Sequence, residues 1–191
     1  MSEHLIAHFR KFVELKDEEA SSILPYFQAI HVPKKQNILE EGDVCKSIFF
    51  VLKGCLRMFF VNDKGIEHTT QFAIEHWWIS DYLAFHHQQN SAFFIQAVEH
   101  TDILVLSYSA QEALLKEFPQ LERYFRLMYQ KAYGAIQLRL KYHYDLSKEE
   151  LYHQFNSSFP EFTQRIPQYL LASYLGFTPE YLSEIRKKNA S

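Results

Sequence analysis

The spacing of apolar residues along the chain first predicts helix. Over residues 2–29, apolar side chains recur three or four positions apart, which is the period of a helix with one buried face. The pattern breaks at Lys16–Glu19, and Pro25 limits the later piece to a short turn of helix. We therefore expect a helical N-terminal segment with one interruption.

Between residues 31 and 107 the pattern changes to that of strands. Short apolar runs alternate with turns that contain glycine, such as Asn62–Gly65, where Gly65 suits the positive φ of a hairpin turn. The runs cover residues 48–52, 56–61, 67–73, 93–98 and 103–106. Regular short strands with tight turns are typical of an antiparallel barrel or sandwich.

The helical period returns after residue 107. Ser109 and Glu112 have the spacing of a capping box, as do Ser147 and Glu150. Residues 159–165 carry no clear period and are expected to form a loop or a short turn. The expected helices cover residues 109–118, 119–144, 147–155, 167–175 and 179–188.

The long helix carries a seam with the heptad spacing of a coiled coil. Successive members lie alternately four and three residues apart, and all but one are apolar. The seam consists of Leu121, Phe125, Met128, Ala132, Ala135, Arg139 and Tyr142. A second copy of the chain is the simplest partner for it, and the alternative is that the helix packs on its own barrel.

Residues 166–188 have the pattern of a helix-turn-helix. Ala172 is small where two helices would nearly touch, and Gly176 stands where the turn needs positive φ. Thr178 and Pro179 suit the N-cap and first position of the second helix. The expected core positions are Leu171, Leu175, Phe177, Leu182 and Ile185. The alternative is an ordinary helical hairpin that ends in glycine.

In such units the second helix enters the major groove of DNA. Glu180 can accept a hydrogen bond from cytosine N4, and Ser183 can contact a base or a phosphate. Basic side chains around the helix are expected on phosphates, although the last three could equally be a solvated C-terminus. The expected DNA-binding residues are Arg165, Thr178, Pro179, Glu180, Ser183, Glu184, Arg186, Lys187 and Lys188.

Composition narrows the class of protein. The chain has 191 residues, is 47% hydrophobic and has only Cys45 and Cys55, too few for a disulfide framework. The N-terminus has neither a signal peptide's apolar run nor a membrane span, so a cytoplasmic protein with no membrane partner is expected. Residues 1–115 carry a net charge of −6 and residues 116–191 one of +3. This asymmetry fits a sensor joined to a nucleic-acid module.

Residues 38–72, with glycines at 42, 54 and 65, resemble the sensor barrel of the bacterial Crp/Fnr family of transcription regulators. The order of barrel, long helix and helix-turn-helix is also similar to that family. The resemblance implies an α+β fold with a cupin-like jelly-roll barrel, a double-stranded β-helix. The implied domains are a sensor at 1–115, a dimerisation helix at 116–145 and a DNA-binding domain at 146–191. The implied partners are double-stranded DNA, a second copy, RNA polymerase and a small-molecule effector of unknown identity.

The nucleotide-binding residues of the family are not matched. Where cyclic-nucleotide-binding members carry Gly-Glu and Arg-Ser pairs, this chain has Ser80-Asp81 and Ser91-Ala92. No Lys or Arg occurs between Lys64 and Lys116, although phosphate recognition normally relies on such cations. We therefore expect no useful affinity for cyclic AMP. The expected pocket residues are Ser80, Asp81, Tyr82, Leu83, Ser91 and Ala92.

The occupant of that pocket stays open at this point. A neutral or apolar effector can fill it, or aromatic side chains can line or plug it. The aromatic candidates are Trp77, Trp78, Phe85, Phe93 and Phe94. Iron–sulfur ligation is excluded by the shortage of cysteines, whereas haem ligation by histidine is not. His86-His87, in a polar loop, and His143 lack metal-ligand spacing, so no metal site or cofactor is expected.

Two further departures concern DNA binding. Only three residues come after Lys188, so no β-hairpin wing is expected, and Glu184 stands where the family often carries an Arg. Both favour an alternative function, a sensor or protein-docking module that has lost DNA binding. No catalytic residues are expected, because no nucleophile–base arrangement or phosphate loop is present.

Overall fold

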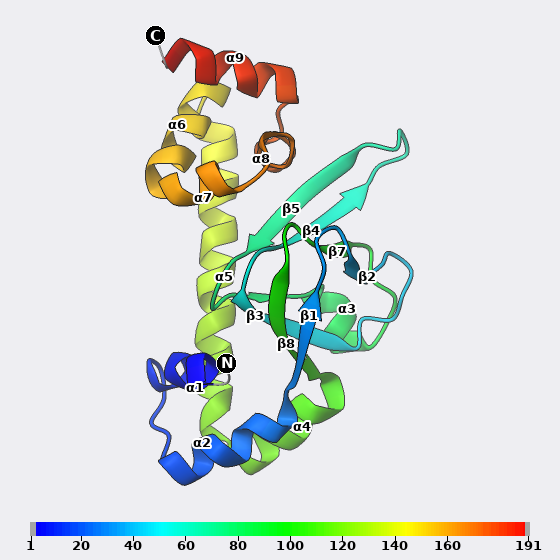
Figure 1. The fold of residues 1–191 in the computed structure, drawn as a ribbon, viewed down its shortest axis with the longest axis vertical. Helices are drawn as coiled ribbons and strands as arrows, with labels where there is room; N and C mark the ends of the chain where they lie inside the picture. Colours follow the sequence, from blue (N-terminus) through cyan, green and yellow to red (C-terminus); the bar gives the residue numbers. More distant parts are fainter. Residues whose placement is uncertain (1–2, 190–191) are drawn as a thin grey trace. The chain divides into compact units, whose positions relative to one another are not determined.

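The computed structural model describes residues 3–189, and they form two compact units. The first unit comprises the residues up to 60 together with 70–129, and the second comprises 61–69 and the residues from 130 onward. Ser2, where the predicted first helix begins, and the last residues Ala190 and Ser191 lie outside the described part. Figure 1 shows the elements in chain order.

Eight strands form two four-stranded sheets, and the strand pairs with a described register are antiparallel. The first sheet has the order β1-β8-β3-β6 and the second the order β2-β7-β4-β5. The strands are β1 Gln28–Val32, β2 Asn37–Leu39, β3 Ser47–Lys53, β4 Leu56–Val61, β5 Glu67–Ala73, β6 Trp78–Ile79, β7 Phe94–Ala97 and β8 Thr101–Ser107. The predicted jelly-roll barrel thus consists of two four-stranded sheets, which do not close into one continuous barrel among the described residues.

Helices precede, interrupt and follow the sheets. Their bounds are α1 Glu3–Arg10, α2 Asp17–Ile23, the 3-10 turn η1 Leu24–Tyr26, α3 Tyr82–His87, α4 Tyr108–Glu117, α5 Gln120–Asp145, α6 Lys148–Ser158, α7 Pro160–Arg165, α8 Gln168–Leu175 and α9 Pro179–Asn189. The long helix α5 matches the predicted one closely and begins just after Pro119.

The core of the first unit joins both sheets to helices α1, α4 and the first half of α5. Tyr124 of α5 has no exposed surface, and its hydroxyl accepts a hydrogen bond from Trp78 Nε1 at 2.7 Å. This bond satisfies a polar group that would be costly to bury without a partner. Burying one large apolar side chain of this kind contributes about 1.5–3 kcal/mol.

The core of the second unit is smaller and lies around α8 and α9. It contains Tyr152, Leu171, Ala172, Leu175, Phe177, Leu182 and Ile185, which confirms all five predicted core positions. Gly176 ends α8 with φ of +76°, and the amide of Phe177 donates to the carbonyl of Ala172 at 2.8 Å. Thr178 Oγ1 accepts from the amide of Tyr181, as expected of an N-cap.

Several local predictions are wrong. The N-terminal helix breaks after Arg10, earlier than expected, and the chain is already strand at Gln28. The cap of α4 is Ser107, which accepts from the amide of Ala110, so Ser109 lies inside the helix. The Ser147–Glu150 capping box, in contrast, is confirmed.

Other elements were missed or shortened. Residues 160–165 form helix α7, helped by a proline at its first position. Helix α6 continues to Ser158, three residues beyond its predicted end. His86 and His87 belong to α3 rather than to a polar loop. Strands β1, β2 and β6 were missed because they are short or carry polar residues that hide the alternation.

Candidate nucleic-acid interface and nucleotide pocket

Helix α9 presents most of the predicted DNA-binding residues to solvent. Ser183 is half-buried. The predicted residues of α9 with exposed side chains are Pro179, Glu180, Glu184, Arg186, Lys187 and Lys188. Thr178, before the helix, and Arg165, at the end of α7, are exposed as well. Arg186, Lys187 and Lys188 lie in the last turn, where their positive charges interact favourably with the negative end of the helix dipole. One face thus combines polar groups near the helix start with cations near its end.

Two contacts within the second unit hold α8, the helix that precedes α9. Ser173 Oγ donates to the carbonyl of Glu67 and accepts from the amide of Thr69, both at 2.9 Å, which joins α8 to the start of strand β5. Arg139 of α5 donates to the backbone carbonyl of Tyr174 at 2.6 Å. The carbon at the centre of its guanidinium lies 3.9 Å from the centre of the Tyr174 ring, as in a cation–π contact. Neither contact was predicted, because each joins residues that are distant in sequence.

In the predicted nucleotide pocket, the Asp81 carboxylate is already hydrogen-bonded to neighbouring groups of the protein. Asp81 Oδ1 accepts from the amide of Ala84 at 3.1 Å and thereby caps helix α3. Asp81 Oδ2 accepts from Ser91 Oγ at 2.9 Å and from the amide of Ala92 at 3.3 Å. The side chain is 8% exposed, so both of its oxygens already have protein donors.

The remaining predicted pocket residues do not converge with Asp81 on one space. Ser80 is buried and donates to the carbonyl of Ser47 at 2.9 Å, with the Cys45 thiol 3.3 Å from its oxygen. Tyr82 packs edge-on against Tyr129, and burial raises the pKa of the Tyr82 hydroxyl. Leu83 is 66% exposed. The structure therefore brings only Asp81, Ser91 and Ala92 together.

The aromatic residues that were candidates for filling the pocket have different roles. Trp78 and Phe85 are buried in the core of the first unit, where Trp78 packs against Phe50 and Phe125. Phe93 and Phe94 are half-buried, and Phe94 stacks on Phe59. Trp77 is 46% exposed, so it does not fill the core of the first unit.

The predicted dimer seam is wrong at its first two positions. Leu121 and Phe125 are at most 4% exposed in the chain's own core, so no second chain can reach them. Met128 packs against the same core but is only partly buried. In the second half, Arg139 contacts Tyr174 of the same chain.

A different face of α5 carries the exposed apolar residues. They are Tyr133, Ile136, Leu140 and Tyr144, which are 64, 60, 54 and 81% exposed, and we call them the α5 stripe. They are spaced three or four residues apart and therefore share one helix face. The first three lie one residue beyond Ala132, Ala135 and Arg139 of the predicted seam, which rotates the face by about 100°. The sequence signal was present, but burial was needed to choose between the two faces.

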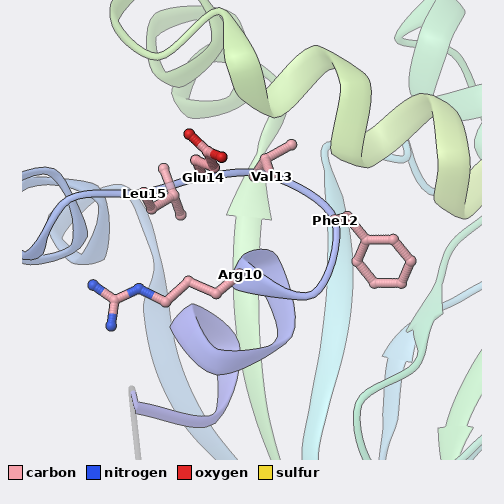
Figure 2. A pocket seen from close by; sticks show the side chains of 5 residues that line it. All are labelled: Arg10, Phe12, Val13, Glu14 and Leu15. Atoms are coloured by element: carbon pink, nitrogen blue, oxygen red, sulfur yellow. The ribbon is translucent and has the colours of Figure 1, made fainter.

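Two other kinds of feature, surface hollows and groups of metal-binding side chains, point to no additional site among the described residues. A shallow hollow lies beside the loop after α1, where the side chains of Arg10 and Phe12 extend in opposite directions (Figure 2). Val13, Glu14 and Leu15 complete its lining. Among the residues from 3 to 189, no three His, Cys, Asp or Glu side chains are placed to hold a metal ion. No helix in that range has the length and apolarity to cross a bilayer.

Comparison with known proteins agrees with this fold. Residues 29–118 match the family model of the cyclic nucleotide-binding domain, and no curated protein matches the chain significantly. The structure is similar to the c-di-GMP-responsive global regulator CLP of Xanthomonas campestris, with a TM-score of 0.73, 12% identity, and coverage of 89% of each chain. It is also similar to FixK2 of Bradyrhizobium japonicum, with a TM-score of 0.71, 14% identity, and coverage of 85% of this chain and 83% of that one.

A third similar structure is described as a transcriptional regulator of the Crp/Fnr family from Eubacterium rectale. Its TM-score is 0.67 and its identity 17%, with coverage of 91% of this chain and 83% of that one. Residues 29–118 thus match the cyclic nucleotide-binding domain, and 85–91% of the chain shares the fold of these three solved structures, one of which is described as a Crp/Fnr regulator.

Proposed function

We propose that the chain is a homodimeric DNA-binding transcription regulator that does not respond to cyclic AMP. The observation that carries this proposal is the pair of helices α8 and α9, joined at Gly176, with the start of α9 exposed. In a chain with the fold of Crp/Fnr regulators, this pair has the pattern of a helix-turn-helix.

In this proposal α9 is the recognition helix. Glu180 and Ser183 lie in its first turns, where side chains of such helices reach base edges. Arg165, Lys187 and Lys188 contact phosphates and supply the affinity that depends on salt. Glu184 can only accept hydrogen bonds and repels phosphates, so its presence favours a site with a cytosine amino group nearby.

The homodimer is supported by the α5 stripe. Four large side chains, each at least 54% exposed on one helix face, leave apolar surface in water unless a partner covers it. The same face of a second copy has matching spacing, which suits a symmetric contact between two copies of the helix. The two recognition helices would then contact half-sites about one turn of DNA apart.

The lack of a response to cyclic AMP is supported by Asp81. Its carboxylate oxygens already accept three hydrogen bonds, from Ala84, Ser91 and Ala92, and the residue is only 8% exposed, so a ribose hydroxyl has little access to it. The carboxylate also places negative charge beside the position where the cyclic phosphate would bind. Cyclic di-GMP, the effector named for CLP, carries phosphates too, so the same argument applies to it.

The alternative is that α6–α9 form a protein-docking module without DNA binding. Exposed aromatic residues in these helices favour it, since Phe159 and Tyr169 are 43 and 52% exposed. Such side chains are common anchors in protein interfaces.

Fluorescence anisotropy distinguishes the two functions. We expect the purified chain to bind a duplex of its own upstream region more tightly than a scrambled duplex, with affinity falling as salt rises. Lys187→Ala should weaken binding to both duplexes alike, whereas Ser183→Ala should reduce the preference for the upstream duplex. Lys131→Ala, on another helix, is the control. Failure to bind either duplex at low salt contradicts the proposal.

Calorimetry tests the effector. Titration with cyclic AMP or cyclic di-GMP should give no heat of binding at micromolar concentrations. A saturable heat for cyclic AMP that is abolished by Asp81→Ala would overturn this part of the proposal while leaving DNA binding intact.

A further inference from the structure

Three histidines gather where α1 packs against the rest of the first unit. His4 and His8 lie four residues apart on α1, and His76 lies in the turn before β6. The centre of the His76 ring is 5.6 Å from that of His4 and 6.2 Å from that of His8, and the His8 and His76 rings are stacked. His76 holds a left-handed backbone conformation, with φ of +70°, which places its ring in this turn. The three imidazoles therefore form one cluster that joins α1 to the sheet.

A hydrogen-bond chain favours the neutral form of His8. The indole of Trp78 can only donate, so the Tyr124 hydroxyl oxygen accepts from it at 2.7 Å. The hydroxyl proton of Tyr124 is then directed at His8 Nδ1, 2.8 Å away. This assignment makes His8 a neutral ring that carries its proton on Nε2. If His8 were protonated, its Nδ1 would donate to the Tyr124 hydroxyl oxygen, and the buried hydroxyl proton of Tyr124 would lose its acceptor.

The charges around His76 also disfavour protonation. Burial lowers the pKa of His76, and His4 and Lys11 lower it further, while only Glu75 opposes them. The Glu75 carboxylate is partly engaged, because its Oε1 accepts from the amide of Gly54 at 2.8 Å. Two of the rings that pack against His8 from other elements, Phe50 and Tyr124, carry no charge.

We propose that His4, His8 and His76 form a pH-sensitive latch that holds α1 on the rest of the first unit and loosens in acid. Histidine in an unfolded or undocked segment titrates near pH 6.5. Because the hydrogen bond of His8 to Tyr124 and the burial of His76 disfavour protonation in the docked state, that state is fully stable above about pH 6.5 and loses stability as the pH falls below it. Leu5 and Phe9 of α1 pack in the core, against residues that include Tyr124 of α5. Loosening of α1 in acid would thus uncover part of that core.

The chain's own tryptophans report on this latch. Trp78 donates to Tyr124, and Trp77 comes directly after His76 in the sequence. We expect a sigmoidal change in tryptophan emission between pH 7.5 and 5.5, measured with a metal chelator present so that no metal ion contributes. Amide exchange in residues 3–10, corrected for the intrinsic effect of pH, should rise roughly tenfold over the same range.

Matched variants separate the cluster from other histidines. In H4Q/H8N/H76N no member can titrate. The amide that H8N introduces keeps an acceptor for Tyr124, and H76N supplies a residue type that tolerates positive φ. The emission change and the faster exchange should then disappear. H86Q/H87Q removes two exposed histidines on α3 and should keep both effects.

A second variant covers the case in which the triple variant does not fold, as judged by circular dichroism at pH 7.5. H4Q/H76N leaves the His8–Tyr124 hydrogen bond in place and should reduce the exchange response at least threefold. An absent response in the unmodified chain, or an equal response in the cluster variants, overturns the proposal.

Discussion

The two halves of helix α5 share one apolar period but have different surroundings. In the first half, Leu121, Tyr124 and Phe125 are at most 4% exposed within the core of the first unit. In the second half, Tyr133, Ile136 and Leu140 are 54–64% exposed. The difference shows that a heptad pattern predicts a helix with a covered face but does not tell which chain covers it. Here the chain itself covers the first half, and the second half carries apolar residues that we assign to a partner copy.

The largest effect should come from the buried half. Phe125→Ala removes a ring that packs against Trp78 and Tyr124, and such truncations cost about 3–5 kcal/mol of the free energy of unfolding. Tyr133→Ala, on the exposed half, should change it by at most about 0.5 kcal/mol in the monomer. Urea denaturation at low protein concentration measures both. Equal losses for the two variants would show that the halves do not differ in this way.

An intermediate effect should appear in self-association. Leu140→Glu places a charge in the α5 stripe and should weaken the dimer by roughly 30-fold or more, the scale of a buried interface anchor. Leu138→Glu is a matched control, because Leu138 is also 54% exposed but lies on the opposite side of the helix. Sedimentation equilibrium should find L138E as dimeric as the unmodified chain. Dissociation by both variants, or by neither, would count against the stripe.

The smallest effect concerns Arg139, which lies in the second half of α5 and contacts Tyr174 of the same chain. Arg139→Ala removes the hydrogen bond to the Tyr174 carbonyl and the contact with its ring, at a cost of about 1–2 kcal/mol. Amide exchange in α8 should therefore become faster. Gln137→Ala, on an exposed position of the same helix, should leave that exchange unchanged. If Arg139→Ala leaves amide exchange in α8 unchanged, the contact of Arg139 with Tyr174 does not stabilise α8.

Local sequence rules predicted what local forces determine. The turn at Gly176, the Thr178 cap and the core positions around them depend on residues within one short segment. The choice of Ser109 over Ser107 as the cap of α4 failed, because strand β8 runs up to Ser107 and leaves the helix to start immediately after it.

Long-range contacts were not predictable in the same way. Asp81 meets Ser91, and Ser173 meets Glu67, only because the fold brings separate segments together. The spacing of His4 and His8 was visible in the sequence, but the third histidine of the cluster comes from residue 76. The exposed fractions of the side chains, rather than their spacing in the sequence, showed which face of α5 carries exposed apolar residues.

The most direct test of the central claim, a DNA-binding regulator that works as a dimer without cyclic AMP, is anisotropy on the upstream duplex. It compares the unmodified chain with L140E and L138E, each with and without cyclic AMP. We expect the unmodified chain and L138E to bind alike, L140E to bind at least roughly tenfold more weakly, and cyclic AMP to change none of the affinities. Equal binding by all three proteins, or binding that requires cyclic AMP, would contradict the account.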